Sequence, residues 1–170
     1  MGPATPDYVR LMARYNAWQN DGLSRVVTAM PPAELTEERG AFWGSILGTL
    51  NHLLWGDAMW LSRFAGTPAP SVGMKEAPTM TPTAAEWAAR RKGLDQTILT
   101  WADGLRDLDL AGDLTWYSGL RKAEVTRPLG PLVVHFFNHQ THHRGQVHHM
   151  LTAAGHSLPD TDLFLMPDGG

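Results

Sequence analysis

The chain has 170 residues, of which 43% are hydrophobic and seven are tryptophan, so it can bury one core and is expected to form a single domain over residues 1–170. Its formal net charge of -3 and its scattered basic residues argue against nucleic acid as a partner. The absence of cysteine excludes disulfides, iron–sulfur clusters and zinc–thiolate sites, so a metal ion would need imidazole and oxygen ligands. No apolar signal segment opens the chain and no stretch is long enough to span a membrane, which predicts a cytoplasmic protein without a membrane partner.

Two helices are predicted in the first part of the chain. Apolar side chains at steps of three and four predict a helix over residues 6–29, which two prolines end. A polar linker follows at residues 33–40, and the same apolar spacing then predicts a second helix over residues 42–64. Residues 65–82 are rich in proline and glycine and are expected to form a long loop.

Two further helices and a hairpin are predicted in the second half. Thr83 and Glu86 have the spacing of a capping box, which predicts a third helix from there to about residue 108. Alternating side chains over residues 113–127 suggest a short hairpin, and a fourth helix is expected over residues 128–154. Four helices of this length with one long crossover loop predict an all-α four-helix bundle with a short β-hairpin before the fourth helix.

The spacing of the histidines is the feature of the sequence that points to chemistry. His139 and His143 lie four residues apart in the last predicted helix, so their imidazoles share one face and can bind one metal ion. His52, in the second predicted helix, is a third candidate ligand. Gly48 and Gly56 lie one turn from it on either side, where small residues leave space for an imidazole and an exogenous ligand. The pattern therefore predicts a metal centre made by histidines of two packed helices.

The same pattern also fits a purely structural interpretation. A single histidine on an apolar helix is more often a hydrogen-bonded core residue than a metal ligand. His135 lies one further turn from His139, so the spacing alone only partly separates metal ligands from the other histidines. Gln140 occupies the position where the zinc-protease pattern requires a glutamate as general base, which excludes that class of protease. Asp57 and Asp21 lack the Glu-x-x-His spacing of di-iron bundles, so a mononuclear site is the simpler prediction.

Two longer segments resemble the DinB family of bacterial proteins, also described as DinB/YfiT-like metalloenzymes and unrelated to the DNA polymerase of similar name. They are Asn51-His52-Leu53-Leu54-Trp55-Gly56-Asp57 and Phe137-Asn138-His139-Gln140-Thr141-His142-His143-Arg144-Gly145-Gln146. Similarity elsewhere extends the resemblance over nearly the whole chain. The resemblance implies a four-helix bundle in up-down-down-up order, frequent homodimers, and a divalent ion held by His52, His139 and His143.

The function that the resemblance implies is broader than one reaction. Some relatives use the metal to activate a low-molecular-weight thiol for transfer or isomerisation, and others resemble hydrolases. Three neutral imidazoles leave the charge of a divalent ion uncompensated and at least one coordination position open, which favours a Lewis-acid role. We therefore expect a metal-dependent enzyme that acts on a small molecule, either a thiol-dependent transferase or a hydrolase. The alternative is a non-catalytic stress-related protein with a structural metal or metal-dependent ligand binding. Zinc or nickel suits imidazole ligands best, with iron and manganese as further options.

Other side chains near the predicted ligands are candidates for proton transfer or for orienting the ligands, although each one by itself is more often a packing or capping residue. They are Asn51, Asp57, Asn138, Gln146 and His135. Arg144 is a candidate to hold an anionic substrate, with an exposed salt bridge as the structural alternative. Trp18, Trp55 and Trp60 are candidates to line the pocket, with a place in the core as the alternative. The motifs assign no catalytic residue.

Overall fold

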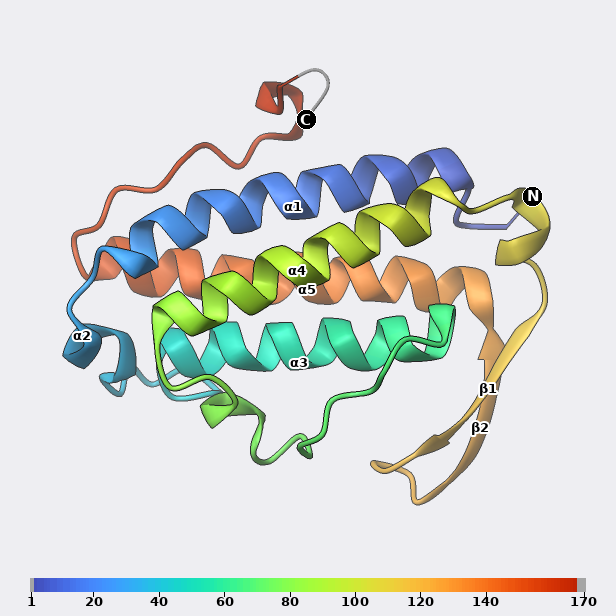
Figure 1. The fold of residues 1–170 in the computed structure, drawn as a ribbon, viewed down its shortest axis with the longest axis horizontal. Coiled ribbons are helices and arrows are strands. Elements are labelled where there is room, and N and C mark those ends of the chain that lie inside the picture. The colour runs from blue at the N-terminus through green and yellow to red at the C-terminus, as the bar shows by residue number, and fades with distance from the viewer. Residues whose placement is uncertain (1, 168–170) are drawn as a thin grey trace.

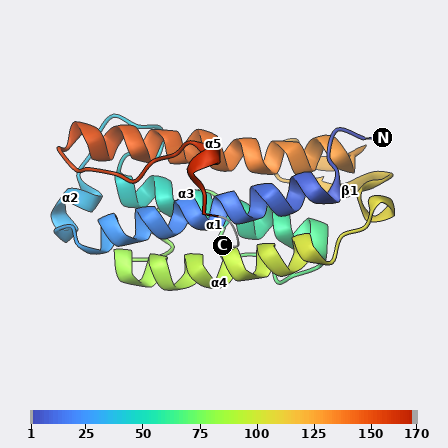
Figure 2. The ribbon, with the colours of Figure 1, turned by 90° about the horizontal axis from the view of Figure 1, so that it is seen from above.

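The computed structural model describes residues 2–167, and most of them belong to four long helices: α1 (Pro6–Thr28), α3 (Ile46–Ala65), α4 (Ala84–Asp103) and α5 (Leu129–Ala153). In Figure 1, α1 and α5 run from right to left, whereas α3 and α4 run from left to right. Seen from above, the four helices extend along a common long axis (Figure 2). The predicted all-α bundle with up-down-down-up order is therefore confirmed. Within the described residues, no helix combines the length and the apolar character needed to cross a membrane.

The starts of three helices follow from hydroxyl caps. The hydroxyl groups of Thr5, Ser45 and Thr83 each accept a hydrogen bond, at 3.0–3.2 Å, from the backbone N–H three residues later. Such a bond satisfies one of the amide groups that the first helical turn leaves without a partner. The second long helix therefore begins at Ile46, directly after its cap, and not at residue 42 as its apolar residues suggest.

Several connecting segments contain short helical turns that the sequence pattern did not predict, and two of these turns bury a leucine. The predicted polar linker contains α2 (Pro32–Thr36), which places Leu35 in the core with 3% of its surface exposed. The third long helix ends at Asp103 and not near residue 108, because the chain turns and continues as a 3-10 turn at Asp107–Leu110. In both cases a single helical turn is enough to bury one leucine.

The long loop between α3 and α4 is tied to the bundle by Asn51. The amide nitrogen of Asn51 donates to the carbonyl oxygens of Pro78 and Thr81, at 3.0 and 2.9 Å. Its amide oxygen accepts from the backbone N–H and the hydroxyl of Thr81, at 3.2 and 2.6 Å. These bonds hold the loop beside the 3-10 turn Ala77–Thr79 and use both polar atoms of the side chain. Asn51 therefore positions the loop and is not available for proton transfer.

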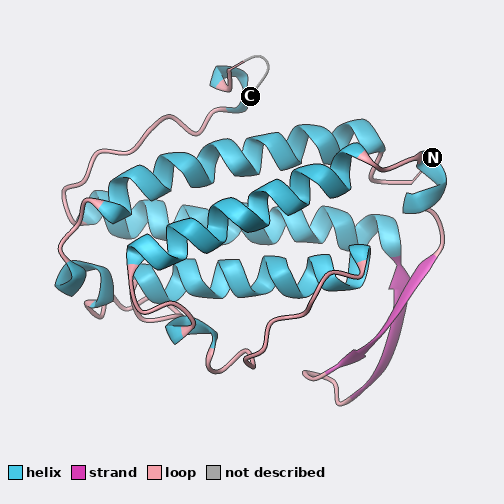
Figure 3. Ribbon diagram, in the orientation of Figure 1, coloured by secondary structure: helices cyan, strands magenta, loops and turns pink. Residues whose placement is uncertain are grey.

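The predicted hairpin is present directly before the last helix. It consists of β1 (Asp113–Ser118) and β2 (Ala123–Pro128), which pair in antiparallel register with Trp116 opposite Val125. Figure 3 shows the two magenta strands projecting from the end of the helical bundle. The hairpin turn includes Lys122 with a φ of 51°, a left-handed conformation that is uncommon outside glycine.

The core of the bundle consists of two apolar clusters, and a polar layer lies between them. One cluster includes Leu50 and Trp87, and the other includes Val9 and Phe137. Each long helix has at least one buried polar side chain at a position between the residues of the two clusters. Buried polar groups of this kind require partners, so the layer restricts how the helices can align. Its members are Asn16, Asn20, Asp57, Arg91, Asp95, Gln140 and Arg144.

Candidate metal centre

Three histidines from two neighbouring helices meet at one site. His52 of α3 and His139 and His143 of α5 each offer a ring nitrogen, and these three atoms lie within 4.8 Å of one another. The Nε2 atoms of His52 and His139 are 3.2 Å apart. Two imidazole nitrogens bound to one ion at about 2.0–2.1 Å are about 2.8–3.4 Å apart in octahedral or tetrahedral geometry. The separation therefore fits a shared metal ion, and the predicted triad could hold one.

The packing of α3 against α5 explains why these residues meet. His139 and His143 lie four residues apart on the face of α5 that packs against α3, so both rings point toward His52. A side chain at Gly56 would place its Cβ 2.9 Å from Cε1 of His139, so only glycine leaves space for this imidazole. The prediction that Gly56 leaves space for an imidazole is thus confirmed. Gly48 has another role, because a Cβ there would meet the carbonyl oxygen of Trp43 at 2.4 Å.

Gln146 holds His143 in one tautomer. The amide oxygen of Gln146 lies 2.7 Å from Nδ1 of His143, and its amide nitrogen lies 3.3 Å from Nε2 of His142. An amide oxygen can only accept, so Nδ1 of His143 carries the proton and donates it to this bond. The lone pair on Nε2 of His143 is then free for a metal ion. Gln146, one of the predicted candidates, therefore orients one of the three candidate ligands.

The other two candidate ligands, His52 and His139, are positioned by packing. Trp43, in the turn before α3, stacks on His52 with a distance of 3.9 Å between ring centroids and an angle of 19° between the planes. The Nδ1 atoms of His52 and His139 are buried and have no hydrogen-bond partner among the described residues. Sequence reasoning missed Trp43, because the residue precedes the helix and its contact with His52 depends on the turn at Ser45.

Burial keeps the three imidazoles neutral. It lowers the pKa of His52 to about 4, with the charge of His143 adding to the effect. Burial also lowers the pKa of His139 to about 3, and the neighbouring histidines act in the same direction. The pKa of His143 is lowered by burial too, although the bond to Gln146 opposes the shift. At neutral pH all three rings therefore present lone pairs, as metal binding requires.

Asp57 and Asn138, two other predicted candidates, do not take part in the triad. Asp57 is fully buried and accepts a hydrogen bond from Nη1 of Arg91 at 2.7 Å. Burial raises the pKa of Asp57 to about 6 although Arg91 opposes this shift. This carboxylate belongs to the polar layer and does not join the ligand cluster. Asn138 is exposed, on the surface of α5.

His135 and Trp60 lie next to the triad on the side toward the hairpin. The ring of His135 is 5.9 Å from that of His139 and 5.4 Å from that of Trp60, measured between centroids. Trp60 in turn contacts Trp116 of β1, and the guanidinium of Arg63 lies over both indole rings, 4.7 and 5.5 Å from their centroids. Aromatic and cationic side chains therefore lead from the triad to the hairpin.

The other predicted pocket residues lie in different places. Trp55 is close to the triad, with its ring 6.2 Å from that of His52 and its Nε1 donating to the carbonyl oxygen of Val72. Trp18 instead contributes to a small cavity beside Leu158 in the C-terminal tail, so its predicted place near the metal is wrong. Arg144 is buried, with 6% of its surface exposed, and does not form the exposed salt bridge that was the structural alternative.

Comparison with known proteins places the whole chain in one family. The curated proteins give no match. The sequence model of the DinB family, in contrast, matches residues 3–169, which is nearly the entire chain. The family match and the cluster of three histidines together fit a metal-binding protein. The chain thus belongs to the DinB family.

Proposed function

We propose that the protein is a metal-dependent enzyme acting on a small molecule, with one divalent ion held by His52, His139 and His143. The observation that supports the proposal is the composition of the cluster. It contains three neutral imidazoles, and no fourth histidine, aspartate or glutamate of the described residues joins it. Three protein ligands with an open position are typical of catalytic sites, whereas structural sites are usually closed by four.

A bound divalent ion would supply Lewis acidity, which lowers the pKa of a water molecule or a thiol at the open position. The protein's own contribution is to hold three rings in place and keep them unprotonated. Gln146 fixes the tautomer of His143, and Trp43 fixes the plane of His52. Zinc or nickel suits this donor set best, and iron or manganese is also compatible with imidazole ligands.

His135 distinguishes the two reaction classes that we propose, transfer to a low-molecular-weight thiol and hydrolysis. Hydrolysis needs a group that accepts a proton from water. The imidazole of His135 lies beside His139, and burial lowers its pKa, so it is neutral at pH 7 and can act as a base. A free thiol has a pKa of about 8.5, far below that of water, so the ion alone can hold it as a thiolate and the transfer does not need this base. We therefore expect a His135→Phe variant to lose hydrolytic activity and to retain thiol transfer.

Cobalt substitution tests whether the centre has an open position. If the histidines are the only protein ligands, azide or a small thiol should change the visible spectrum of a sample that contains one cobalt ion per chain. The matching activity experiment is a thiol-conjugation and hydrolysis screen of the metal-loaded and metal-stripped protein. A spectrum that stays unchanged at saturating ligand would indicate a closed centre. In that case the result would favour the alternative proposal, a non-catalytic protein whose metal ion links α3 and α5.

We also propose that the protein forms a homodimer, as its family suggests. In the part of the chain that the structure describes, α1 and α5 expose no large apolar side chain that would supply an interface. Among the described residues, the large apolar side chains that are exposed lie in loops, in the hairpin and in the tail, namely Phe42, Met74, Leu108, Tyr117, Leu120, Leu163, Phe164 and Leu165. Light scattering at micromolar concentration tests the assembly, and a monomeric mass would exclude a stable dimer.

A further inference from the structure

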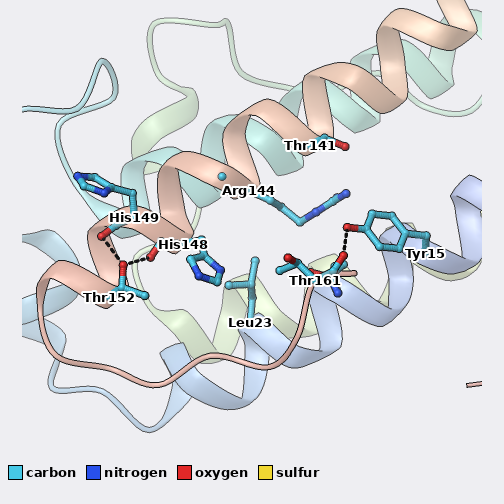
Figure 4. Close-up of a pocket in the computed structure, with 10 residues that line it drawn as sticks. Tyr15, Leu23, Thr141, Arg144, His148, His149, Thr152 and Thr161 are labelled. Atoms are coloured by element: carbon cyan, nitrogen blue, oxygen red, sulfur yellow. Dashed lines mark hydrogen bonds between the residues drawn. The ribbon is translucent and has the colours of Figure 1, made fainter. Parts of the chain in front are cut away.

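A second cavity, of about 360 Å³, lies between α1, α5 and the C-terminal tail. Figure 4 shows its side chains converging from the two helices and from the tail that crosses beneath them. No aspartate or glutamate lines the cavity, whereas a guanidinium, imidazoles, hydroxyl groups, the aromatic ring of Tyr15 and the aliphatic side chain of Leu23 do. The lining residues that matter here are Tyr15, Leu23, Thr141, Arg144, His148 and Thr161.

This cavity is separate from the metal centre. Successive residues of an α-helix are rotated by about 100°, so Thr141 and His148 lie on the side of α5 roughly opposite His139. The cavity faces α1, whereas the triad faces α3. A ligand in the cavity would therefore have no direct contact with an ion held by the histidines.

Arg144 gives the cavity a positive charge without a direct ionic partner. Its side chain is 94% buried, since only 6% of its surface is exposed. Nη1 donates to the amide oxygen of Asn16, a neutral group, and the guanidinium carbon lies 5.6 Å from the centroid of the Tyr15 ring. The two buried carboxylates nearby, Asp57 and Asp95, are both paired with Arg91. Within the described part of the chain, Nε and Nη2 of Arg144 donate to no residue.

The charge of Arg144 persists at neutral pH. An arginine guanidinium remains protonated in proteins even where it is buried. A guanidinium in such a place is stabilised by an anion that accepts hydrogen bonds from its free edge. Arg144 is thus a buried, protonated donor that lines a cavity and lacks an anionic partner.

The tail closes one side of the cavity through two hydrogen bonds. The hydroxyl of Tyr15 donates to the carbonyl oxygen of Thr161 at 2.7 Å, and Nε2 of Gln19 donates to that of Asp160 at 3.0 Å. These bonds hold the tail against α1, and Figure 4 shows Tyr15 bonded to Thr161 beside the end of Arg144. The tail therefore forms the wall of the cavity that lies opposite α5.

We propose that this cavity binds a small monocarboxylate with an apolar chain, its carboxylate on Arg144 and its chain against Leu23 and the Tyr15 ring. A single guanidinium matches one negative charge, and its planar edge matches the two oxygens of a carboxylate. A phosphate dianion would need more cationic donors than Arg144 supplies. The volume lies within the range of about 300–1,000 Å³ that is usual for small-molecule sites.

Calorimetric titration with hexanoate tests the proposal, with inorganic phosphate as the comparison anion. Two variants of the full-length protein remove different parts of the site. Arg144→Gln removes the charge, and Gly145→Leu places a side chain in the cavity, where a Cβ meets no other atom within 4 Å. The matched control is Gly93→Leu on α4, where the glycine is also helical and also has open space around it.

We expect hexanoate to bind the wild type and the Gly93→Leu variant equally, and each of the other two variants to bind at least about tenfold more weakly. Binding should be the same with and without bound metal. Because Arg144 is itself part of the polar layer, Arg144→Gln can prevent folding, and in that case the Gly145→Leu variant alone tests the proposal. Circular dichroism and metal content identify folded variants.

Four results would overturn the proposal. The first is no saturable binding of hexanoate to the wild type up to about 10 mM. The second is unchanged binding in the folded Gly145→Leu variant. The third is binding that disappears when the metal is removed, which would place the carboxylate on the ion. The fourth is phosphate binding as tight as that of hexanoate, which would rule out a contribution of the apolar chain.

Discussion

The amide oxygen of Gln146 accepts a hydrogen bond from Nδ1 of His143 at 2.7 Å, and this bond leaves Nε2 of His143 free for a metal ion. Partners of this kind typically change metal affinity by about 10–100-fold when they are removed. A Gln146→Leu variant should therefore bind zinc about 10–100-fold more weakly than the wild type. Competition with a chromophoric chelator measures the affinity.

The conservative variant distinguishes this role from a merely structural one. Gln146→Glu keeps an oxygen that accepts from His143, so its zinc affinity should stay within about threefold of the wild type. Equal loss of affinity in the leucine and glutamate variants would contradict the assigned hydrogen bond.

The lowered pKa values of His52 and His139 predict how the metal-free protein responds to acid. In the unfolded chain these rings bind protons as the pH falls below about 6.5, whereas the folded protein takes them up only near the pKa values of about 4 and about 3. Between these limits the unfolded state binds more protons, so folding stability falls as the pH falls. Metal loss should likewise require a pH well below 6.5, since the rings in the folded protein stay neutral.

A His139→Gln variant isolates the contribution of His139 to this pH dependence, because the other titratable groups contribute equally in the variant and in the wild type. Asp57, whose raised pKa of about 6 has the opposite effect on stability, is one of them. The metal-free variant should lose less free energy of unfolding between pH 7 and pH 5 than the metal-free wild type. Urea unfolding at the two pH values measures this difference, and parallel losses would show that His139 titrates normally in the fold.

The ion pair between Asp57 and Arg91 predicts a large cost for removing one partner. Both side chains are 1% exposed, and their closest atoms are 2.7 Å apart. Loss of one buried partner typically costs 3–5 kcal/mol, so Asp57→Ala should lower the free energy of unfolding by about 3 kcal/mol, because Arg91 keeps its bond to Asp95. The exposed pair of Asp21 and Arg25 provides the control, and Asp21→Ala should cost less than about 1 kcal/mol. Similar values for the two variants in urea unfolding would contradict the structural role of the buried pair.

The helices and the triad could be predicted because they depend on local spacing. Apolar residues at steps of three and four follow from the helical repeat, so the four long helices and the pair of His139 and His143 are visible in the sequence. His52 lies on another helix, and the resemblance to the DinB family supported its assignment. The small residue at Gly56 was a correct local signal, since it faces the ring of His139.

The remaining features depend on contacts between elements. Trp43 stacks on His52 only because the chain turns before Ser45, and nothing in the spacing of the residues specifies that turn. Asp57 lies five residues after His52, but its side chain pairs with Arg91 on a different helix and does not join the histidine cluster. The burial of Arg144 likewise depends on the packing of α1 and of the tail against α5.

The metal content of purified variants tests the central claim, that His52, His139 and His143 hold one divalent ion. Elemental analysis by mass spectrometry should find about one ion per chain in the wild type and less than about a tenth of that when any of the three is replaced with alanine, because two imidazoles compete poorly with water and buffer. His149→Ala is the matched control, since this histidine lies on the same helix, lines the other cavity and should leave the content unchanged. Wild-type metal content in the three triad variants would contradict the assignment of the site.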